Sequence, residues 1–149
     1  MPTFEYVVEG SFDAAHSLPN YDGPCKFLHG HTWKVRILVS VFVMEQLFRE
    51  LEGLLIDFKL IKSCFRKYDH THLNASFPFP FRPTAETLAC TIWSDCYNAI
   101  TRVDPTLTIQ RLCVELWESV DSCVTIRAGA ECACCVDTMK RYVEGCITP

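Results

Sequence analysis

The sequence predicts an α+β fold built on an antiparallel sheet. Two strand-like segments open the chain, helix-like segments follow, and two further strand-like segments close it, with turn residues between them. Strands grouped at both ends of the helical part are typical of α+β domains rather than of alternating βαβ units. The 149 residues, of which 49% are hydrophobic, suffice for one domain with its own core.

The first pair of strands is predicted over residues 3–16 and 32–43. The earlier segment alternates in part and contains Phe, Tyr and Val, and the later one is rich in β-branched residues. The run between them holds Asn20, Gly23 and Pro24, which favour turns. We therefore expect the two strands to pair across this loop.

Helical spacing follows the first strands. Residues 44–52 place leucines at every fourth position and predict a short helix, and residues 54–57 predict a short strand. Residues 58–68 keep helical spacing and predict a second helix that breaks at Asp69 and His70.

The second half of the domain contains a third helix and a hairpin. Residues 77–83 are too rich in proline to be helical and predict an extended connector. Thr84 is placed to cap a helix, with Glu86 in its first turn, where a carboxylate is favoured by the helix dipole. Residues 107–118 and 122–128 predict the two strands of a hairpin.

Composition excludes several classes of function. The net charge is −4 and no basic run occurs, which argues against a nucleic-acid partner. The N-terminus lacks the pattern of a signal peptide, and the apolar run over residues 37–44 is too short to span a bilayer. We therefore expect a cytoplasmic protein without a membrane partner, whose ten cysteines are mostly reduced.

Residues 12–33 carry a candidate metal site. On an extended chain, His29 and His31 project to the same side, and His16 can join them if the turn-rich loop folds back. Three neutral imidazoles suit Zn²⁺, and three protein ligands leave a position for water or substrate. The spacing leaves open an alternative, a closed structural zinc site with Cys25 as the fourth ligand.

Six motifs occur in the order found in the 6-pyruvoyl-tetrahydropterin synthase and 6-carboxytetrahydropterin synthase family, which the chain resembles over about residues 4–128. The motifs are Phe12-Asp-Ala-Ala-His16, Cys25-x-x-x-His29-Gly-His31, Gly53-x-x-x-Asp57-Phe58, Tyr68-Asp69-His70-x-x-Leu73-Asn74, Pro83-Thr-Ala-Glu86 and Val114-x-Leu-x-Glu118-Ser119. Each motif alone is weak or moderate evidence, but all six in sequence are highly specific.

The resemblance implies a tunnelling fold, in which a four-stranded antiparallel sheet carries a helix pair on one face. It also implies a homo-oligomer, with a hexamer built as a dimer of trimers favoured, whose sheets close into a barrel with active sites between subunits. It places residues 1–128 in a single pterin synthase-like domain. A Cys-rich extension over residues 129–149 lies outside the resemblance, and residues 44–52 replace a link that is shorter and more polar in the family.

The substrate that the resemblance implies is 7,8-dihydroneopterin triphosphate, with Zn²⁺ as the cofactor. The implied roles are zinc binding by His16, His29 and His31, proton transfer by Cys25, Asp69 and His70, and pterin recognition by Glu118. Thr84 and Glu86 could also touch the substrate, although their place at the start of a helix explains both. Because adjacent residues on a strand face opposite ways, we expect the Asp-His pair to act across a subunit boundary.

The three-residue gap between Cys25 and His29 resembles the carboxytetrahydropterin synthases that serve the synthesis of deazaguanine-modified nucleosides. We therefore expect a 6-carboxy-5,6,7,8-tetrahydropterin synthase, which releases acetaldehyde and triphosphate. One alternative is a 6-pyruvoyl-tetrahydropterin synthase, which only eliminates triphosphate. A second is a non-catalytic module that binds zinc or a pterin.

Overall fold

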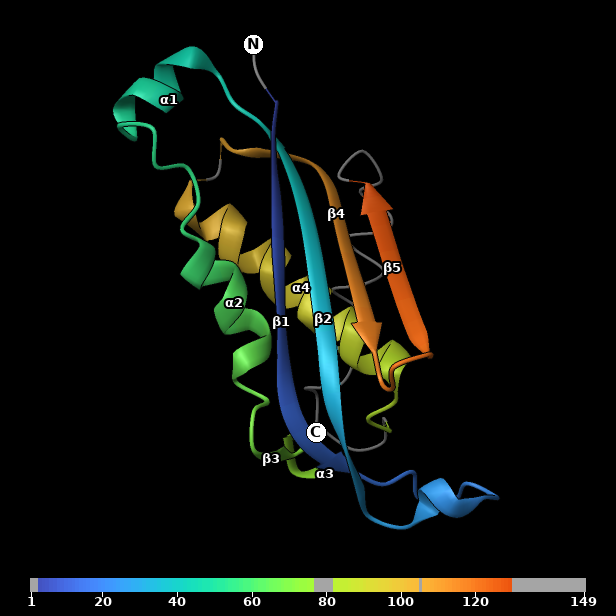
Figure 1. The fold of residues 1–149 in the computed structure, drawn as a ribbon. Coiled ribbons are helices and arrows are strands. Elements are labelled where there is room, and N and C mark those ends of the chain that lie inside the picture. Colours follow the sequence, from blue (N-terminus) through green and yellow to red (C-terminus); the bar gives the residue numbers. More distant parts are fainter. Residues whose placement is uncertain (1–2, 77–81, 105, 130–149) are drawn as a thin grey trace, which may run out of the picture.

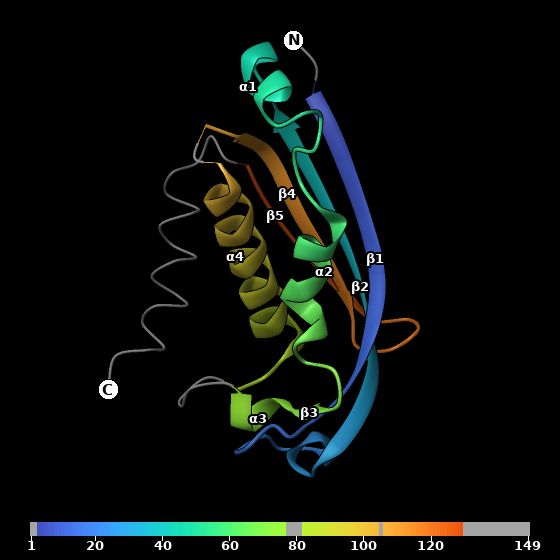
Figure 2. The same cartoon turned by 90° about the vertical axis from the view of Figure 1, so that its left-hand side faces the viewer.

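A computed structural model describes residues 3–76, 82–104 and 106–129 of the protein. In it, one face of a five-stranded sheet is covered by helices, as Figures 1 and 2 show. The elements in chain order are β1 (Thr3–His16), a 3-10 turn (Pro24–Lys26), β2 (His29–Phe42), α1 (Glu45–Glu50), α2 (Phe58–Arg66), β3 (Thr71–His72), α3 (Leu73–Ser76), α4 (Ala85–Val103), β4 (Thr108–Trp117) and β5 (Cys123–Gly129).

The strand order in the sheet is β3-β1-β2-β4-β5. The four long strands pair antiparallel, β1 with β2, β2 with β4 and β4 with β5. This pairing confirms the predicted antiparallel sheet and both predicted hairpins. Two details differ from expectation. The strand β2 begins at His29 rather than at residue 32, and the two-residue strand β3 adds a parallel pairing to β1 at Ala14 and Ala15.

The predicted helices are present, and α2 and α4 form the pair on one face of the sheet (Figure 2). Asp57 begins α2 by accepting a hydrogen bond from the Lys59 N–H at 2.8 Å. The side chain of Thr84 likewise accepts from the Thr87 N–H and caps α4. The sequence therefore marks where both helices begin.

The predicted strand over residues 54–57 is wrong. These residues form a connector without regular secondary structure, and none of them pairs with a strand in the described part of the chain. Leu55 and Ile56 are buried in the core, and Asp57 is used as the cap of α2. Burial at a helix entrance gave these apolar residues the appearance of a strand.

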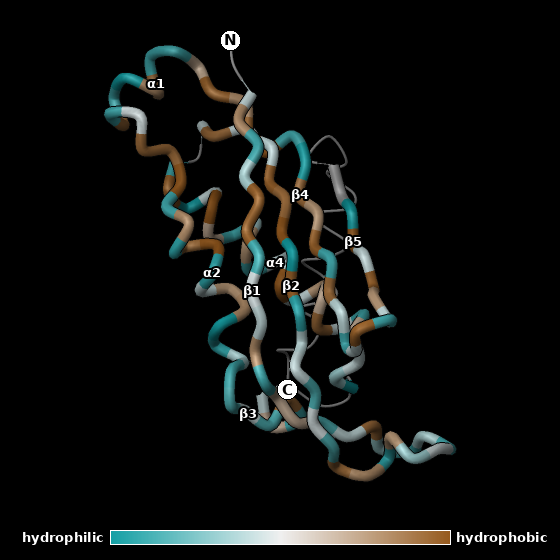
Figure 3. The backbone as a smooth tube through the Cα atoms, viewed as in Figure 1, coloured by the Kyte–Doolittle hydropathy of each residue, from teal (hydrophilic) through white to brown (hydrophobic). Residues whose placement is uncertain are grey.

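The core lies between the sheet and the helix pair. Alternate residues of β2 are fully buried, and the stripe on α4 that includes Leu88, Ile92 and Cys96 is buried with them. Figure 3 shows the matching alternation of hydropathy along β1 and β2. Gly10 allows close approach, because a Cβ added there would lie 2.8 Å from the ring of Phe65 on α2.

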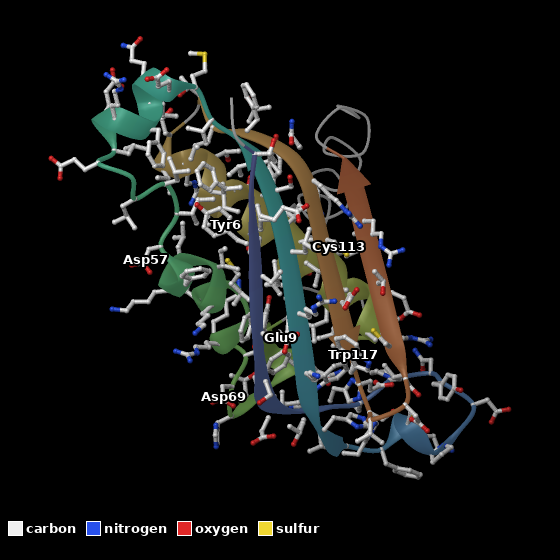
Figure 4. The ribbon with its side chains drawn as sticks, turned by 45° about the horizontal axis from the view of Figure 1, so that its top comes forward. Tyr6, Glu9, Asp57, Asp69, Cys113 and Trp117 are labelled. Atoms are coloured by element: carbon white, nitrogen blue, oxygen red, sulfur yellow. The ribbon has the colours of Figure 1, made fainter. Side chains whose placement is uncertain are left out.

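The other face of the sheet carries charge. The Nε atom of Arg36 lies 3.2 Å from a Glu9 carboxylate oxygen, and its Nη1 lies 3.4 Å from Glu115. Figure 4 labels Glu9 on β1 and Trp117 on β4, and the strand β2 lies between these two strands. An ionic row of this kind indicates that this face is not a second hydrophobic core.

Two predicted features lie at or beyond the limits of the described residues. The connector over residues 77–83 is described only at 82–83, which have no regular secondary structure, and the Cys-rich extension lies outside the described residues from residue 130 onward. Within the described ranges, no helix combines the length and apolarity needed to cross a membrane.

Candidate metal centre and active site

The three histidines converge at the end of the sheet remote from α1. The β1–β2 register pairs His16 directly with His29, and it pairs Ala14 with His31. Ring centroids lie 4.5 Å apart for His16 and His29, 5.1 Å for His16 and His31, and 4.9 Å for His29 and His31. One donor nitrogen from each ring lies within 4.8 Å of the other two, so one ion can meet all three.

Backbone carbonyl groups orient two of the rings. The Nδ1 atom of His16 lies 2.8 Å from the Pro83 oxygen, and that of His29 lies 2.8 Å from the Phe27 oxygen. A carbonyl oxygen only accepts, so Nδ1 must carry the proton, which leaves the Nε2 lone pair of both rings free. This is the arrangement that fixes a metal-ligating imidazole in proteins.

The residues present fit a metal ion. The Nε2 atoms of His16 and His31 are buried and have no hydrogen-bond partner among the described residues. A buried nitrogen without a partner is costly, and a bound cation would satisfy both. Burial lowers the pKa of His16 and of His31, so both rings are neutral near pH 7, as metal binding requires.

The buried ring of Trp33 packs against two histidines of this centre. Trp33 lies two residues beyond His31 on the same face of β2, and its ring meets those of His16 and His31 edge-on at 5.2 and 5.5 Å. Phe12 stacks on its other side at 6.1 Å. Trp33 is fully buried, so it restricts the movement of both imidazoles.

A cavity of about 380 Å³ adjoins the centre and gathers most of the other predicted site residues. Cys25, Thr84, Glu86 and Glu118 line it together with His16. The Glu118 carboxylate approaches the centre, and its Oε1 lies 3.5 Å from Nε2 of His16. The structure therefore joins residues that are separated by more than ninety positions in the chain.

Asp69 and His70 lie apart from this cavity. They follow α2 in a turn at the same end of the sheet, where Figure 4 labels Asp69. His70 instead lines a second cavity of about 520 Å³ with Asp13 and His31, and Cys25 is not among the residues of that cavity. Within one chain, Cys25 and His70 of the predicted proton-transfer set therefore line different cavities, and Asp69 lines neither.

The expected geometry of the Asp-His pair is wrong in one respect. The two residues lie in a turn rather than on a strand, and Nδ1 of His70 is 3.1 Å from Oδ1 of Asp69. His70 has a positive φ of 57°, which turns its side chain back toward its neighbour. The Asp13 N–H and, to a lesser extent, His70 lower the pKa of Asp69, so its carboxylate is ionised.

Sequence reasoning assigned no role to Asp13 or to Asn74, although both lie within the quoted motifs. The Asp13 N–H donates to Asp69, and its carbonyl accepts from the His70 N–H at 2.7 Å. The Asn74 amide makes two hydrogen bonds of 2.8 Å to the backbone of Ser17, which fixes the start of the loop after His16. Both residues act through neighbours distant in sequence, which local patterns do not reveal.

Two relatives are named for the same activity. The 6-carboxy-5,6,7,8-tetrahydropterin synthase of Haemophilus influenzae is 32% identical over 143 residues, which cover 80% of this chain and 95% of the relative. The protein of that name from Synechocystis is 34% identical over 96 residues, covering 61% of this chain and 73% of the relative.

Solved structures give the same architecture at lower identity. The 6-pyruvoyl tetrahydropterin synthase of Caenorhabditis elegans matches with a TM-score of 0.62 at 20% identity, over 87% of this chain and 98% of that chain. The Plasmodium falciparum enzyme matches with a TM-score of 0.61 at 18% identity, over 85% and 98%. At these identities the likeness shows the fold, and it confirms the predicted tunnelling fold.

The model of the family described as 6-pyruvoyl tetrahydropterin synthase matches residues 5–129, which include every residue of the metal centre and of both cavities. By this match, together with the histidine centre and the fold, the chain belongs to the 6-pyruvoyl tetrahydropterin synthase family.

Proposed function

We propose that the protein is a zinc-dependent pterin synthase that converts 7,8-dihydroneopterin triphosphate and water to 6-carboxy-5,6,7,8-tetrahydropterin, acetaldehyde and triphosphate. Family membership supports the broader description, a pterin synthase of the lyase type. One observation carries the proposal. Three imidazoles have convergent donor nitrogens, and one of them, His16, lines a cavity that a thiol and a carboxylate also line.

His16, His29 and His31 would hold the zinc ion through neutral imidazole nitrogens. When bound, the ion supplies Lewis acidity, which makes carbon-bound protons next to the substrate's side-chain oxygens acidic enough to remove near pH 7. The chain contributes the ligand geometry, since backbone carbonyls hold His16 and His29 and Trp33 packs beneath His16 and His31.

Cys25 is the proposed base. It is half-buried on the 3-10 turn and lines the cavity beside His16, where a substrate carbon near the centre would lie within its reach. A cysteine thiolate is a competent proton acceptor when it is held close to the reacting carbon. The loop is fixed locally, because the Leu18 N–H donates to the Cys25 carbonyl at 2.8 Å.

Glu118 is the proposed anchor of the pterin. Its two carboxylate oxygens match a pair of neighbouring N–H donors on the pyrimidinone edge, which gives strong and directional recognition. Thr84 and Glu86 lie at the start of α4 on the wall of the same cavity, so they are candidates for further contacts to the substrate.

Asp69 and His70 are the proposed relay that carries the proton onward. Because His70 and Cys25 line different cavities of one chain, we propose that a second copy brings its relay to the Cys25 cavity. The protein would then be a cytoplasmic homo-oligomer, a hexamer of two trimers, with active sites between subunits. Among the described residues, β5 has no strand on its outer side and β1 is covered there only at Ala14 and Ala15 by β3, so sheets of neighbouring copies could join at both edges.

Two observations favour the carboxy product over the pyruvoyl product. The gap between Cys25 and His29 contains three residues, and the Haemophilus influenzae relative, which matches over 143 residues, is named for the carboxy product. The alternative of a closed zinc site completed by Cys25 loses support, since the close group of donor atoms among the described residues contains no thiol.

Product analysis tests the proposal. The zinc-loaded protein is incubated with 7,8-dihydroneopterin triphosphate, and acetaldehyde, triphosphate and the pterin product are measured. We expect acetaldehyde and 6-carboxytetrahydropterin in equal amounts. A pyruvoyl product without acetaldehyde would replace this proposal with the alternative synthase, and tight pterin binding without any product would indicate a binding module.

Matched histidine variants complete the experiment. His31→Ala is expected to lose zinc and turnover together, because it removes one of the three convergent nitrogens. His72→Ala removes the same type of residue from an exposed position on β3, outside the centre, and is expected to keep both.

A further inference from the structure

We propose that Glu118 is itself a ligand of the metal ion in the substrate-free protein, and that binding of the pterin ring withdraws it. The inference rests on the proposed function, in which the same carboxylate recognises the pterin. It adds a step to that function, because the ion would become available to the substrate only when the ring is in place.

Distances place the carboxylate at the centre. Its Oε1 lies 3.5 Å from Nε2 of His16 and 3.9 Å from Nε2 of His31. Two ligands of a tetrahedral zinc ion lie about 3.3–3.5 Å apart, given bonds of about 2.0–2.2 Å, so the first distance matches a shared ion and the second is slightly longer. Carboxylate oxygen is among the common ligands of Zn²⁺ in proteins.

The same two nitrogens are buried without hydrogen-bond partners among the described residues. An ion bound by both of them must lie near the carboxylate that approaches both. The group of donor atoms that all lie within 4.8 Å of one another contains the three histidines and neither Cys25 nor Glu118. The Glu118 carboxylate nevertheless lies within 3.9 Å of two of the three rings, so a small rotation of its side chain would complete a four-ligand site. Cys25 is then left free to act as a base.

The backbone of Glu118 is fixed, but its side chain is free to turn. Its N–H donates to the Ser122 carbonyl at 3.1 Å across the mouth of the β4–β5 hairpin. The carboxylate accepts no hydrogen bond from the residues that the structure describes, and the side chain is 36% exposed. Rotation about its own torsions can therefore move the carboxylate between the centre and the adjoining cavity.

Rotation of the Glu118 side chain would change the number of protein ligands on the ion. A four-ligand zinc site is closed, whereas three protein ligands leave the position that a reactive site needs. The two N–H donors of a pterin ring compete for the Glu118 oxygens through strong, directional hydrogen bonds. Recognition of the ring at one end of the cavity would thus open the ion to the side-chain oxygens at the other.

The test uses cobalt-substituted full-length protein, because the visible absorption of Co²⁺ reports its ligands without turnover. Glu118→Gln is expected to shift the cobalt spectrum of the substrate-free protein and to weaken zinc affinity by at least about tenfold, measured by chelator competition. Glu118→Asp, which shortens the reach, is expected to shift the spectrum as well. Glu115→Gln, which removes a carboxylate on β4 that contacts Arg36, is expected to change neither.

Unsubstituted pterin, which lacks the side-chain oxygens, provides the second arm. Its addition is expected to move the wild-type cobalt spectrum toward that of Glu118→Gln and to leave the variant's spectrum unchanged. Unaltered spectra and zinc affinity in both Glu118 variants would overturn the inference while leaving the proposed function intact. A wild-type protein that binds neither Co²⁺ nor Zn²⁺ would instead overturn the proposed function and the inference with it.

Discussion

The imidazole of His70 faces its neighbour Asp69, with Nδ1 and Oδ1 3.1 Å apart, and both residues are held by the backbone of Asp13. This turn keeps the pair together at the surface of the chain, where both side chains are exposed. The pair is preformed and exposed, and His70 and Cys25 line different cavities. The pair can therefore contact the active site of a neighbouring copy.

Subunit mixing tests this arrangement. Cys25→Ala and Asp69→Asn are each expected to be nearly inactive alone, because each removes one half of every site. When the two variants are unfolded, mixed in equal amounts and refolded together, roughly a quarter of the sites should combine an intact Cys25 with an intact Asp69 from different copies, and activity should reappear.

A refolded mixture that stays inactive would place all three proton-transfer residues in one subunit. Each variant refolded alone serves as the control for recovery, and wild-type protein taken through the same cycle sets the scale. Size-exclusion chromatography with light scattering shows whether the mixed species has the mass of an oligomer.

Cys25 distinguishes a catalytic thiol from a structural ligand. Cys25→Ala is expected to retain one zinc ion per chain with unchanged thermal stability while turnover falls by at least about a hundredfold, the scale of a lost general base. Zinc content is measured by elemental analysis and turnover by acetaldehyde release. Cys90→Ala, on α4 and outside the cavity, is expected to retain both; loss of zinc from Cys25→Ala alone would assign the thiol to the metal.

Local patterns predicted much of this fold because the relevant signals are short-range. The turn-rich loop brought His16 opposite His29, and Thr84 began a helix as its side-chain chemistry requires, whereas the helix cap at Asp57 was not predicted. The connector before α2 was mistaken for a strand because buried apolar residues give the same signal in both settings.

The candidate site was predicted only as far as its residues lie in recognisable motifs. The convergence of three histidines followed from their spacing and from strand pairing. The contact between Asp69 and His70 did not, because it depends on a positive φ at His70 that no pattern indicated. Glu118 and His16 lie near opposite ends of the domain's sequence. Only the complete fold could therefore reveal that they approach each other.

The metal-free protein should lose stability in mild acid. Burial lowers the pKa of His16 and of His31 below the ordinary 6.5, so the unfolded chain binds protons more readily than the folded one between those values. The free energy of unfolding therefore has its full value above pH 6.5. It falls as the pH drops from 6.5 toward the lowered pKa values of the folded protein. Urea titrations of the chelator-treated protein between pH 7.5 and 5.5 measure the slope.

The slope should shrink in His31→Gln, which removes one of the two rings whose pKa burial lowers. It should be unchanged in His72→Ala, whose ring is exposed. A slope that is the same in all three proteins would show that other groups govern the acid sensitivity. Added zinc should flatten the wild-type curve near neutral pH, because it binds only the folded, deprotonated ligands.

Gly10 should tolerate no side chain, because α2 packs directly against the strand there. A Cβ at this position would lie 2.8 Å from Cε2 and Cζ of the buried Phe65 ring, so Gly10→Ala is expected to lower the free energy of unfolding by about 1–3 kcal/mol through overpacking. Gly30→Ala, whose Cβ would meet only an ordinary contact at 3.7 Å, is the control in metal-free protein. Because Phe65→Leu removes the clashing ring atoms, the double variant should be less destabilised than the sum of the single changes, as measured by urea denaturation. Additive effects would mean that the cost of Gly10→Ala does not come from a clash with the Phe65 ring.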